Sequence, residues 1–228
     1  MSALGRATFL LYATVQFLVL TLAAMATYAG GTLFDPTTTR YAFFQNFFSD
    51  LGTTRSYSGR SNSVSCVMFV VALVSIGAAL VAFSGSWRSF AFARGRAASI
   101  GSASQGFGAA SGVAFVGIAL TPWNLMLGAH NLLVLAAFSL LLGYVVCLTI
   151  VLRENGAAAS QVLANITYLA VLFGYVGLLF FGPGLGTEHG HFVQVTGQKI
   201  IVYVSMTNLS FQAFATRRTL VASRAQRV

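Results

Sequence analysis

The stretch "VSCVMFVVALVSIGAALVAFS", Val64 to Ser84, contains no charged side chain and no proline. An uninterrupted apolar run of about 20 residues is the length that a helix needs to cross a hydrocarbon core of roughly 30 Å. Charged groups are costly inside a bilayer, so their absence from the whole stretch fits the same environment. The stretch therefore predicts a transmembrane helix.

The rest of the chain has the same bias. Of its 228 residues, 57% are hydrophobic and only 7% are charged, and the mean hydropathy is +0.79. A soluble globular domain has roughly a quarter of its residues charged, so the composition indicates a membrane protein. The net charge of +9 does not indicate nucleic acid, because the 13 basic residues fall at the ends of apolar segments and not along one face. We expect membrane lipids as partners and no nucleic acid.

Six apolar segments along the chain are long enough to cross a bilayer as helices. They lie near residues 8–30, 64–84, 99–121, 126–151, 158–182 and 196–215. No polar linker or internal repeat divides the chain, so we expect one domain over residues 1–228. The fold class that follows is an all-α membrane protein, a bundle of six transmembrane helices with a long first outer loop.

The arginines predict the orientation. With both termini cytoplasmic, the inner side holds nine basic residues: Arg6, Arg88, Arg94, Arg96, Arg153, Arg217, Arg218, Arg224 and Arg227. The outer side then holds four: Arg40, Arg55, Arg60 and Lys199. The positive-inside rule favours this arrangement. Alternatively, the first apolar run ends in the small residues of a secretory cleavage site, but it is longer than a usual signal core, so we expect it to be retained.

Strongly polar residues gather at the predicted outer end. The first outer loop, about residues 31–63, contains Asp50, and Trp123 follows in the turn between the third and fourth helices. His130 lies one turn inside the fourth helix, and Lys199 is the last residue of the last outer loop, "GPGLGTEHGHFVQVTGQK". In the first loop a helical turn would place Phe44, Phe47 and Phe48 on one interfacial face, and Gly52 would let the chain turn sharply.

Three motifs in this order resemble a known family. They are "NFFSDLGTTRSYSGRSNSVSC" (residues 46–66), "HNLLVLAAF" (130–138) and "GQKIIVYVSMTNLSFQAF" (197–214). The first resembles the first outer loop of the Frag1/DRAM/Sfk1 membrane proteins, and is more similar still to the bacterial and archaeal family catalogued as domain of unknown function 998. The matching positions are Asn46, Ser49, Asp50, Gly52, His130, Gln198 and Lys199.

The resemblance implies six helices and lipid-associated work but no particular reaction. Characterised members of the Frag1/DRAM/Sfk1 family are implicated in GPI-lipid remodelling, phospholipid distribution and autophagy-linked membrane regulation, and the 998 family has no established activity. The closer bacterial resemblance and the alanine-rich helices lean towards a bacterial plasma membrane.

Two interpretations of the outer polar cluster remain open. In one, the cluster binds a lipid headgroup, with Lys199 offsetting the charge of Asp50, His130 bonding a phosphate and Trp123 lining the mouth. In the other it is a latch: Asp50 pins the loop over the bundle, and His130 satisfies a backbone carbonyl. The resemblance adds Asn46, Ser49 and Gln198 to the candidate ligand-binding residues.

Other functions have weaker support. His130, His189 and His191 with Asp50 are suitable zinc ligands, but no metal-type helix signature is present, so we expect no metal and no cofactor. Ser49 has the residue type for a lipid hydrolase but no nucleophile elbow, so we lean against an enzyme. A small structural or assembly subunit of a membrane complex is the other alternative. Its basic C-terminal tail, "TRRTLVASRAQRV", would hold the anionic inner leaflet or a partner subunit.

Overall fold

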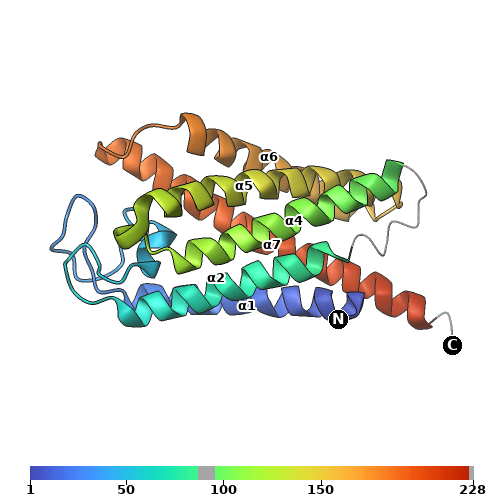
Figure 1. Cartoon of the computed structure of the whole chain (residues 1–228), viewed down its shortest axis with the longest axis horizontal. Coiled ribbons are helices and arrows are strands. Elements are labelled where there is room, and N and C mark those ends of the chain that lie inside the picture. The colour runs from blue at the N-terminus through green and yellow to red at the C-terminus, as the bar shows by residue number, and fades with distance from the viewer. Residues whose placement is uncertain (87–95, 226–228) are drawn as a thin grey trace.

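The structure is a computed structural model that describes residues 1–86 and 96–225, with side chains for residues 1–86 and 99–222. Within these residues it contains six α-helices, one short 3-10 helix and no β-strand (Figure 1). The α-helices are α1 (Ala3–Thr27), α2 (Ser63–Ser84), α4 (Arg96–Leu120), α5 (Trp123–Glu154), α6 (Ala159–Phe181) and α7 (Glu188–Ala225). The 3-10 helix η1 (Phe48–Gly52) lies in the first loop, residues 28–62. The side chains of Arg88, Arg94, Arg96, Arg224 and Arg227, which entered the orientation argument, lie outside the described part.

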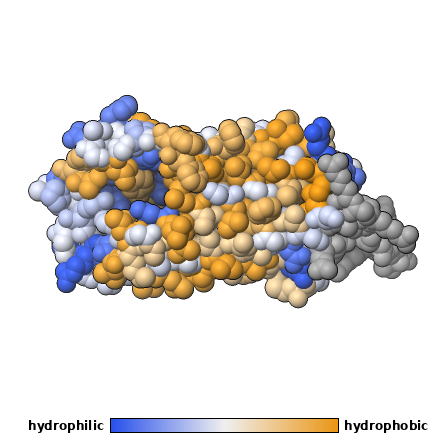
Figure 2. Space-filling model, turned by 45° about the horizontal axis from the view of Figure 1, so that its top comes forward, coloured by the Kyte–Doolittle hydropathy of each residue, from blue (hydrophilic) through white to orange (hydrophobic). Residues whose placement is uncertain are grey.

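Five of the described helices, α1, α2, α5, α6 and the Ser99–Leu120 part of α4, are long and apolar enough to cross a membrane. The prediction of an all-helical chain with membrane-type helices is confirmed to that extent. The sixth helix, α7, is 38 residues long but more polar than the others. On the face seen in Figure 2, a broad apolar surface covers the middle of the molecule and hydrophilic patches lie towards its ends, as expected of an integral membrane protein.

The helices pack in chain order, each against the next, and α7 also packs against α1, which closes the bundle. Figure 1 shows the first loop, the α4–α5 turn and the α6–α7 turn at one end, which we call the loop end. The start of α1, the α5–α6 turn and the end of α7 lie at the opposite end, the terminal end.

Glycines allow a close contact between α2 and α4. A Cβ atom on Gly77 of α2 would lie 2.7 Å from the carbonyl oxygen of Gly112 in α4, and one on Gly112 would lie 2.6 Å from that of Gly77. Real Cβ atoms essentially never approach so closely. Helix α4 therefore packs backbone to backbone on α2, because small residues let the two helix backbones approach closely.

Polar side chains at mid-depth bond one helix to another. Asn165 of α6 donates to Thr149 of α5 at 2.7 Å, and its Oδ1 accepts from Asn208 of α7 at 3.2 Å. One turn further along α7, the Gln161 side chain donates to Gln212 at 2.9 Å. All of these side chains are buried, so they hold α5, α6 and α7 together where water is absent.

The most marked differences from the sequence prediction are at the two ends of α7, which continues to Ala225 although the predicted segment ended near residue 215, so that most of the basic C-terminal tail is helical. The helix begins at Glu188, although the chain was expected to remain a loop until about residue 196. His189 and His191 therefore project from a helix, where residues two apart point to different sides. His189 is exposed, whereas His191 is buried.

The aromatic residues of the first loop do not form one interfacial face. Phe43 and Phe44 are exposed in a turn, whereas Phe48 starts η1 and is buried against Phe17 and Tyr203. The interface prediction is therefore wrong for Phe48, because the helical turn begins later in the chain than expected. Local sequence shows that the rings are apolar but not which of them pack into the bundle.

Gly52 also has a different role from the expected sharp turn. Its φ is not positive, in contrast to Gly30 (+90°), Gly31 (+85°) and Gly59 (+78°). A Cβ atom on Gly52 would lie 2.5 Å from the ring of Phe69 in α2. Gly52 is therefore required for close packing of η1 on α2, and the turning is done by the other glycines.

Candidate functional site

The first loop folds back across the loop end because two glycines reverse its direction. Gly30 and Gly31 both have φ in the left-handed region, and a Cβ on Gly31 would collide with the backbone of Ser58. Glycine adopts this conformation without steric cost. The reversal brings η1, near the middle of the loop, onto α2, α1 and α5.

Asp50 lies at the centre of the folded loop and is only 1% exposed. Its Oδ2 accepts hydrogen bonds from the backbone N–H of Phe47 at 2.9 Å and from Nδ2 of Asn46 at 3.1 Å. Its Oδ1 accepts from the indole Nε1 of Trp123, the first residue of α5, at 3.1 Å. The carboxylate thus caps η1 and at the same time ties the loop to α5.

Burial raises the pKa of Asp50 to about 6. The hydrogen bonds from Asn46, Phe47 and Trp123 and the positive charge of Lys199 act in the opposite direction and limit the rise. Removal from water disfavours the charged form of a carboxyl group, and donors that point at it favour that form. Protein groups have therefore replaced most, but not all, of the hydration that the carboxylate loses.

Asn46 connects Asp50 to Lys199 and is fully buried. Its Nδ2 donates to Asp50 and to the carbonyl of Gly31 at 3.0 Å, and its Oδ1 accepts from the N–H of Ala42 at 2.9 Å. Its backbone carbonyl accepts from Nζ of Lys199 at 2.5 Å. The acid and the base therefore share one intermediary, and no direct ion pair joins them.

Lys199 projects from α7 into the underside of the loop and is 3% exposed. Besides Asn46 it donates to the hydroxyl of Tyr41 at 2.7 Å. Its Nζ lies 5.1 Å from the ring centroid of Tyr41, 5.4 Å from that of Phe43 and 4.6 Å from that of Phe48. Three aromatic rings thus surround the ammonium group at distances where a cation is attracted to a ring face.

Further hydrogen bonds fasten the loop at both sides. Oε1 of Gln198 in α7 accepts from the N–H of Phe48 at 2.7 Å, a contact between residues 150 positions apart. On the other side, Asn124 of α5 accepts from the N–H of Thr54 and donates to its hydroxyl, at 3.2 and 2.8 Å. The loop is therefore held to α5 and to α7 by paired polar groups.

Of the predicted site residues, the structure brings Asn46, Asp50, Trp123, Gln198 and Lys199 together. The side chains of the other two, Ser49 and His130, make no hydrogen bond to these residues.

His130 uses Nδ1 to bond the carbonyl of Thr121 at 2.7 Å, which holds the α4–α5 turn and corresponds to the carbonyl role considered above. Ser49 is half-buried and is not among the groups that bond Asp50. In the described part of the chain, no group of three or more His, Cys, Asp or Glu side chains lies close enough to hold a metal ion. His191 instead packs its ring edge to face with Phe34 and Phe47.

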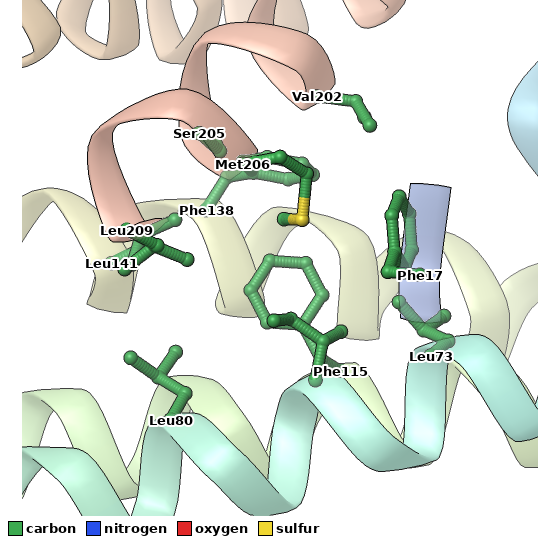
Figure 3. A pocket seen from close by; sticks show the side chains of 11 residues that line it. Phe17, Leu73, Leu80, Phe115, Phe138, Leu141, Val202, Ser205, Met206 and Leu209 are labelled. Carbon is green, nitrogen blue, oxygen red and sulfur yellow. The ribbon is translucent and has the colours of Figure 1, made fainter. Parts of the chain in front are cut away.

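Below η1 the bundle core contains a small apolar cavity. Figure 3 shows residues of α1, α2, α4, α5 and α7 around it, among them Phe17, Phe115, Phe138 and Met206. Its volume is about 50 Å³, and its exposed lining is entirely apolar. The one hydroxyl at its edge, on Ser205, already bonds Ile201 and Tyr168. A cavity of this size and lining suits neither a headgroup nor a bound water.

Two important residues of this network were missed from the sequence. Tyr41 donates to the carbonyls of Asn46 and Phe47, both at 3.0 Å, while it accepts from Lys199. Asn62, 2% exposed, directs its Nδ2 at the carbonyls of Leu51 and Thr53, at 3.2 and 3.1 Å. An asparagine directly before a helix is typical of a helix cap, and nothing in the local sequence around Tyr41 indicates a buried role.

Comparisons with family models, with curated proteins and with solved structures found no match to this chain. The resemblance to the 998 and Frag1/DRAM/Sfk1 families therefore stays a prediction from the three motifs.

Proposed function

We propose that this chain is a lipid-interacting integral membrane protein whose first loop is a lid, fastened over the loop end of the bundle by a buried polar latch. The latch consists of Tyr41, Asn46, Asp50, Trp123, Gln198 and Lys199. All six α-helices cross the membrane in this proposal, the loop end faces outward, and both termini are cytoplasmic. The basic C-terminal tail then meets the anionic inner leaflet.

The observation that supports the latch is that its two charged groups, Asp50 and Lys199, already have hydrogen-bond partners within the protein. Both oxygens of Asp50 are occupied by donors from the protein, and Lys199 donates to two protein oxygens. A headgroup site needs donors that remain free for the ligand and space beside them. Here the donors are used within the protein, and both side chains are almost completely buried. This favours the latch over a headgroup site at the same residues.

The latch is tested by loosening one contact between α7 and the loop. Gln198→Ala removes the acceptor for Phe48, and the matched control Gln194→Ala removes bonds from the same helix to Leu178 and Pro183 instead. The first loop contains exposed trypsin sites at Arg55 and Arg60. We expect trypsin to cleave the loop several-fold faster in Gln198→Ala than in the wild type, and no such change in Gln194→Ala.

The headgroup alternative predicts a different result in the same assay. A short-chain anionic phospholipid would then slow cleavage of the wild-type loop, and this protection would disappear in Gln198→Ala. The latch predicts that any effect of the lipid on loop cleavage is the same in both proteins. Equal cleavage of the wild type and Gln198→Ala without lipid would contradict the latch.

A further inference from the structure

The first loop descends beside the helices instead of lying above their ends. The ring of Phe48, at the start of η1, lies 6.4 Å from that of Phe17 in α1. Phe17 precedes the end of α1 at Thr27 by ten residues, which is about 15 Å along the helix axis. At the end of η1, Gly52 meets Phe69, which lies six residues, or about 9 Å, after the start of α2. The 3-10 helix is therefore well below the ends of α1 and α2 (Figure 1).

Two phenylalanines of the loop lie along one face of α7. Phe43 stacks on Tyr203 with ring centroids 6.3 Å apart, and Phe44 lies 6.1 Å from Phe192. The two loop rings are in edge contact with each other at 5.0 Å. Phe192 and Tyr203 are eleven residues apart, close to three helical turns, so they share a face of α7 over about 16 Å. These four rings form a continuous aromatic strip on that face.

The aromatic strip explains how α7 can carry a lysine on an outward face. The face is turned outward, since Phe192 and the neighbouring Ile200 are exposed. Lys199 lies seven residues after Phe192 and four before Tyr203, so its side chain leaves the helix on the same side. It is nevertheless buried, because three aromatic rings of the loop surround its Nζ. Without the loop, an ammonium group would face the surroundings of the bundle, which is costly where these are lipid.

The outer side of the strip is exposed and apolar. Phe43 and Phe44 are 37% and 52% exposed. The same face of α7 continues towards the terminal end with Phe214, which is eleven residues beyond Tyr203 and also exposed. A contiguous exposed apolar patch marks an interaction surface. Because this one lies below the helix ends and runs on into the apolar side of the bundle, the partner that fits it is the bilayer.

The backbone of the descending segment, residues 41–52, is compatible with that depth. Two loop carbonyls accept from the hydroxyl of Tyr41, one loop N–H donates to Gln198, and a further carbonyl accepts from Asn62. Non-helical backbone lies at membrane depth only where it is buried in protein or lines a water-filled cavity. Here the latch and its neighbours supply the partners that water would supply to an ordinary loop.

We infer that the lid is a re-entrant loop: residues 41–52 lie within the outer leaflet, and Phe43 and Phe44 contact its acyl chains. The inference rests on the proposed crossing of the membrane by all six α-helices. The lid then has two sides, a polar one fastened by the latch and an apolar one covered by lipid. Opening it moves two phenylalanine rings out of hydrocarbon, so the bilayer itself helps to keep the lid closed.

The test places single tryptophans in the full-length protein in nanodiscs of phosphatidylcholine brominated on one acyl chain. Phe44→Trp keeps an aromatic ring at an exposed position, so the variant should fold. Thr39→Trp is the matched control, because Thr39 is exposed in the same loop but outside the descending segment. Phe173→Trp, at an exposed position in the middle of α6, reports whether the helices are in the bilayer at all. The emission of the native Trp87 and Trp123, measured in the wild type, is subtracted.

We expect the brominated lipid to remove most of the emission of the tryptophan introduced at position 44 and at position 173, and almost none of that at position 39. Iodide in the water should have the opposite effect. If position 173 is quenched by the lipid but position 44 only by iodide, the loop lies in water, and the re-entrant loop is wrong while the proposed function stands. Protection of position 44 from both quenchers would show that protein covers it and would also overturn the inference. Absence of lipid quenching at position 173 would overturn the membrane crossing and the inference together.

Discussion

Replacing Asn46 by alanine tests the latch at the residue that is hydrogen-bonded to both its acid, Asp50, and its base, Lys199. The change leaves the N–H of Ala42 and the carbonyl of Gly31 without the side chain that now pairs them, and Asp50 loses one of its three donors. Each buried backbone group left unpaired costs about 1–2 kcal/mol, and a hydrogen bond to a charged group contributes about 1.5 kcal/mol. The sum is about 4 kcal/mol. For a chain of this size, that corresponds to a fall in melting temperature of about 10 °C.

The matched control is Gln45→Ala, because Gln45 is the adjacent residue, is exposed, and its side chain is not part of the latch. Both variants would be purified in the same detergent and unfolded by heat, with trypsin cleavage of the first loop followed in parallel. Asn46→Ala should melt well below the wild type and be cleaved faster, whereas Gln45→Ala should match the wild type in both respects.

The same variant makes a second, independent prediction. A hydrogen bond from Asn46 lowers the pKa of Asp50, so its removal should raise that pKa further above 6. The midpoint of the pH dependence of stability should move to higher pH with it. If Asn46→Ala melts within about 2 °C of Gln45→Ala, which on the same conversion is under about 1 kcal/mol, the side chain is not structural. A simultaneous loss of lipid affinity would then favour the headgroup interpretation.

Three further predictions follow from the same end of the molecule. Because burial raises the pKa of Asp50 to about 6, the fold favours its protonated form. The free energy of unfolding should therefore increase by about 1 kcal/mol as the pH falls from 7 to 5, a slope in melting temperature that Asp50→Asn should abolish. Gly52→Ala forces a methyl group against an aromatic ring of α2 and should lower the free energy of unfolding by about 1–3 kcal/mol. Gly184→Ala places its methyl group in open space and should leave stability almost unchanged. Similar melting temperatures for the two variants would contradict the packing argument. Asn62→Ala leaves buried loop carbonyls unpaired and should lower the free energy of unfolding by about 3 kcal/mol, measured by thermal unfolding. The control is Ser61→Ala, because Ser61 is exposed. Equal stability of the two variants would show that water replaces the Asn62 side chain.

Much of the fold was predictable because a bilayer imposes a simple rule on sequence. A helix that crosses it must be apolar over about 20 residues, so segments such as residues 64–84 can be recognised from composition alone. The six predicted segments fall on the six helices, with modest errors at most ends. The large error was at α7, where "GTEHGHFVQVTGQK" has the glycines and polar residues of a loop but forms helix from Glu188 onward. Packing against α1 and α6 stabilises that helix, and composition does not report packing.

The candidate site was predictable in part for a related reason. Polar residues are rare in this chain, so the gathering of Asp50, Trp123, Gln198 and Lys199 at one predicted end was visible along the sequence. Their mutual arrangement was not. Whether Lys199 touches Asp50 directly or through Asn46 depends on the rotation of α7 about its axis and on the path of a 35-residue connection that two glycines reverse.

The sequence by itself thus determined that the chain is helical, that most of its helices are apolar enough to cross a membrane, and which end holds the polar groups, since each of these depends on local composition. Only the tertiary structure decided which polar groups are already paired. Asp50 and Lys199 are occupied by other protein groups at the loop end. Pairing is set by contacts between residues that are far apart in the sequence, such as Gln198 and Phe48, which are 150 positions apart, and these contacts form only when helix packing fixes the separation and rotation of each element.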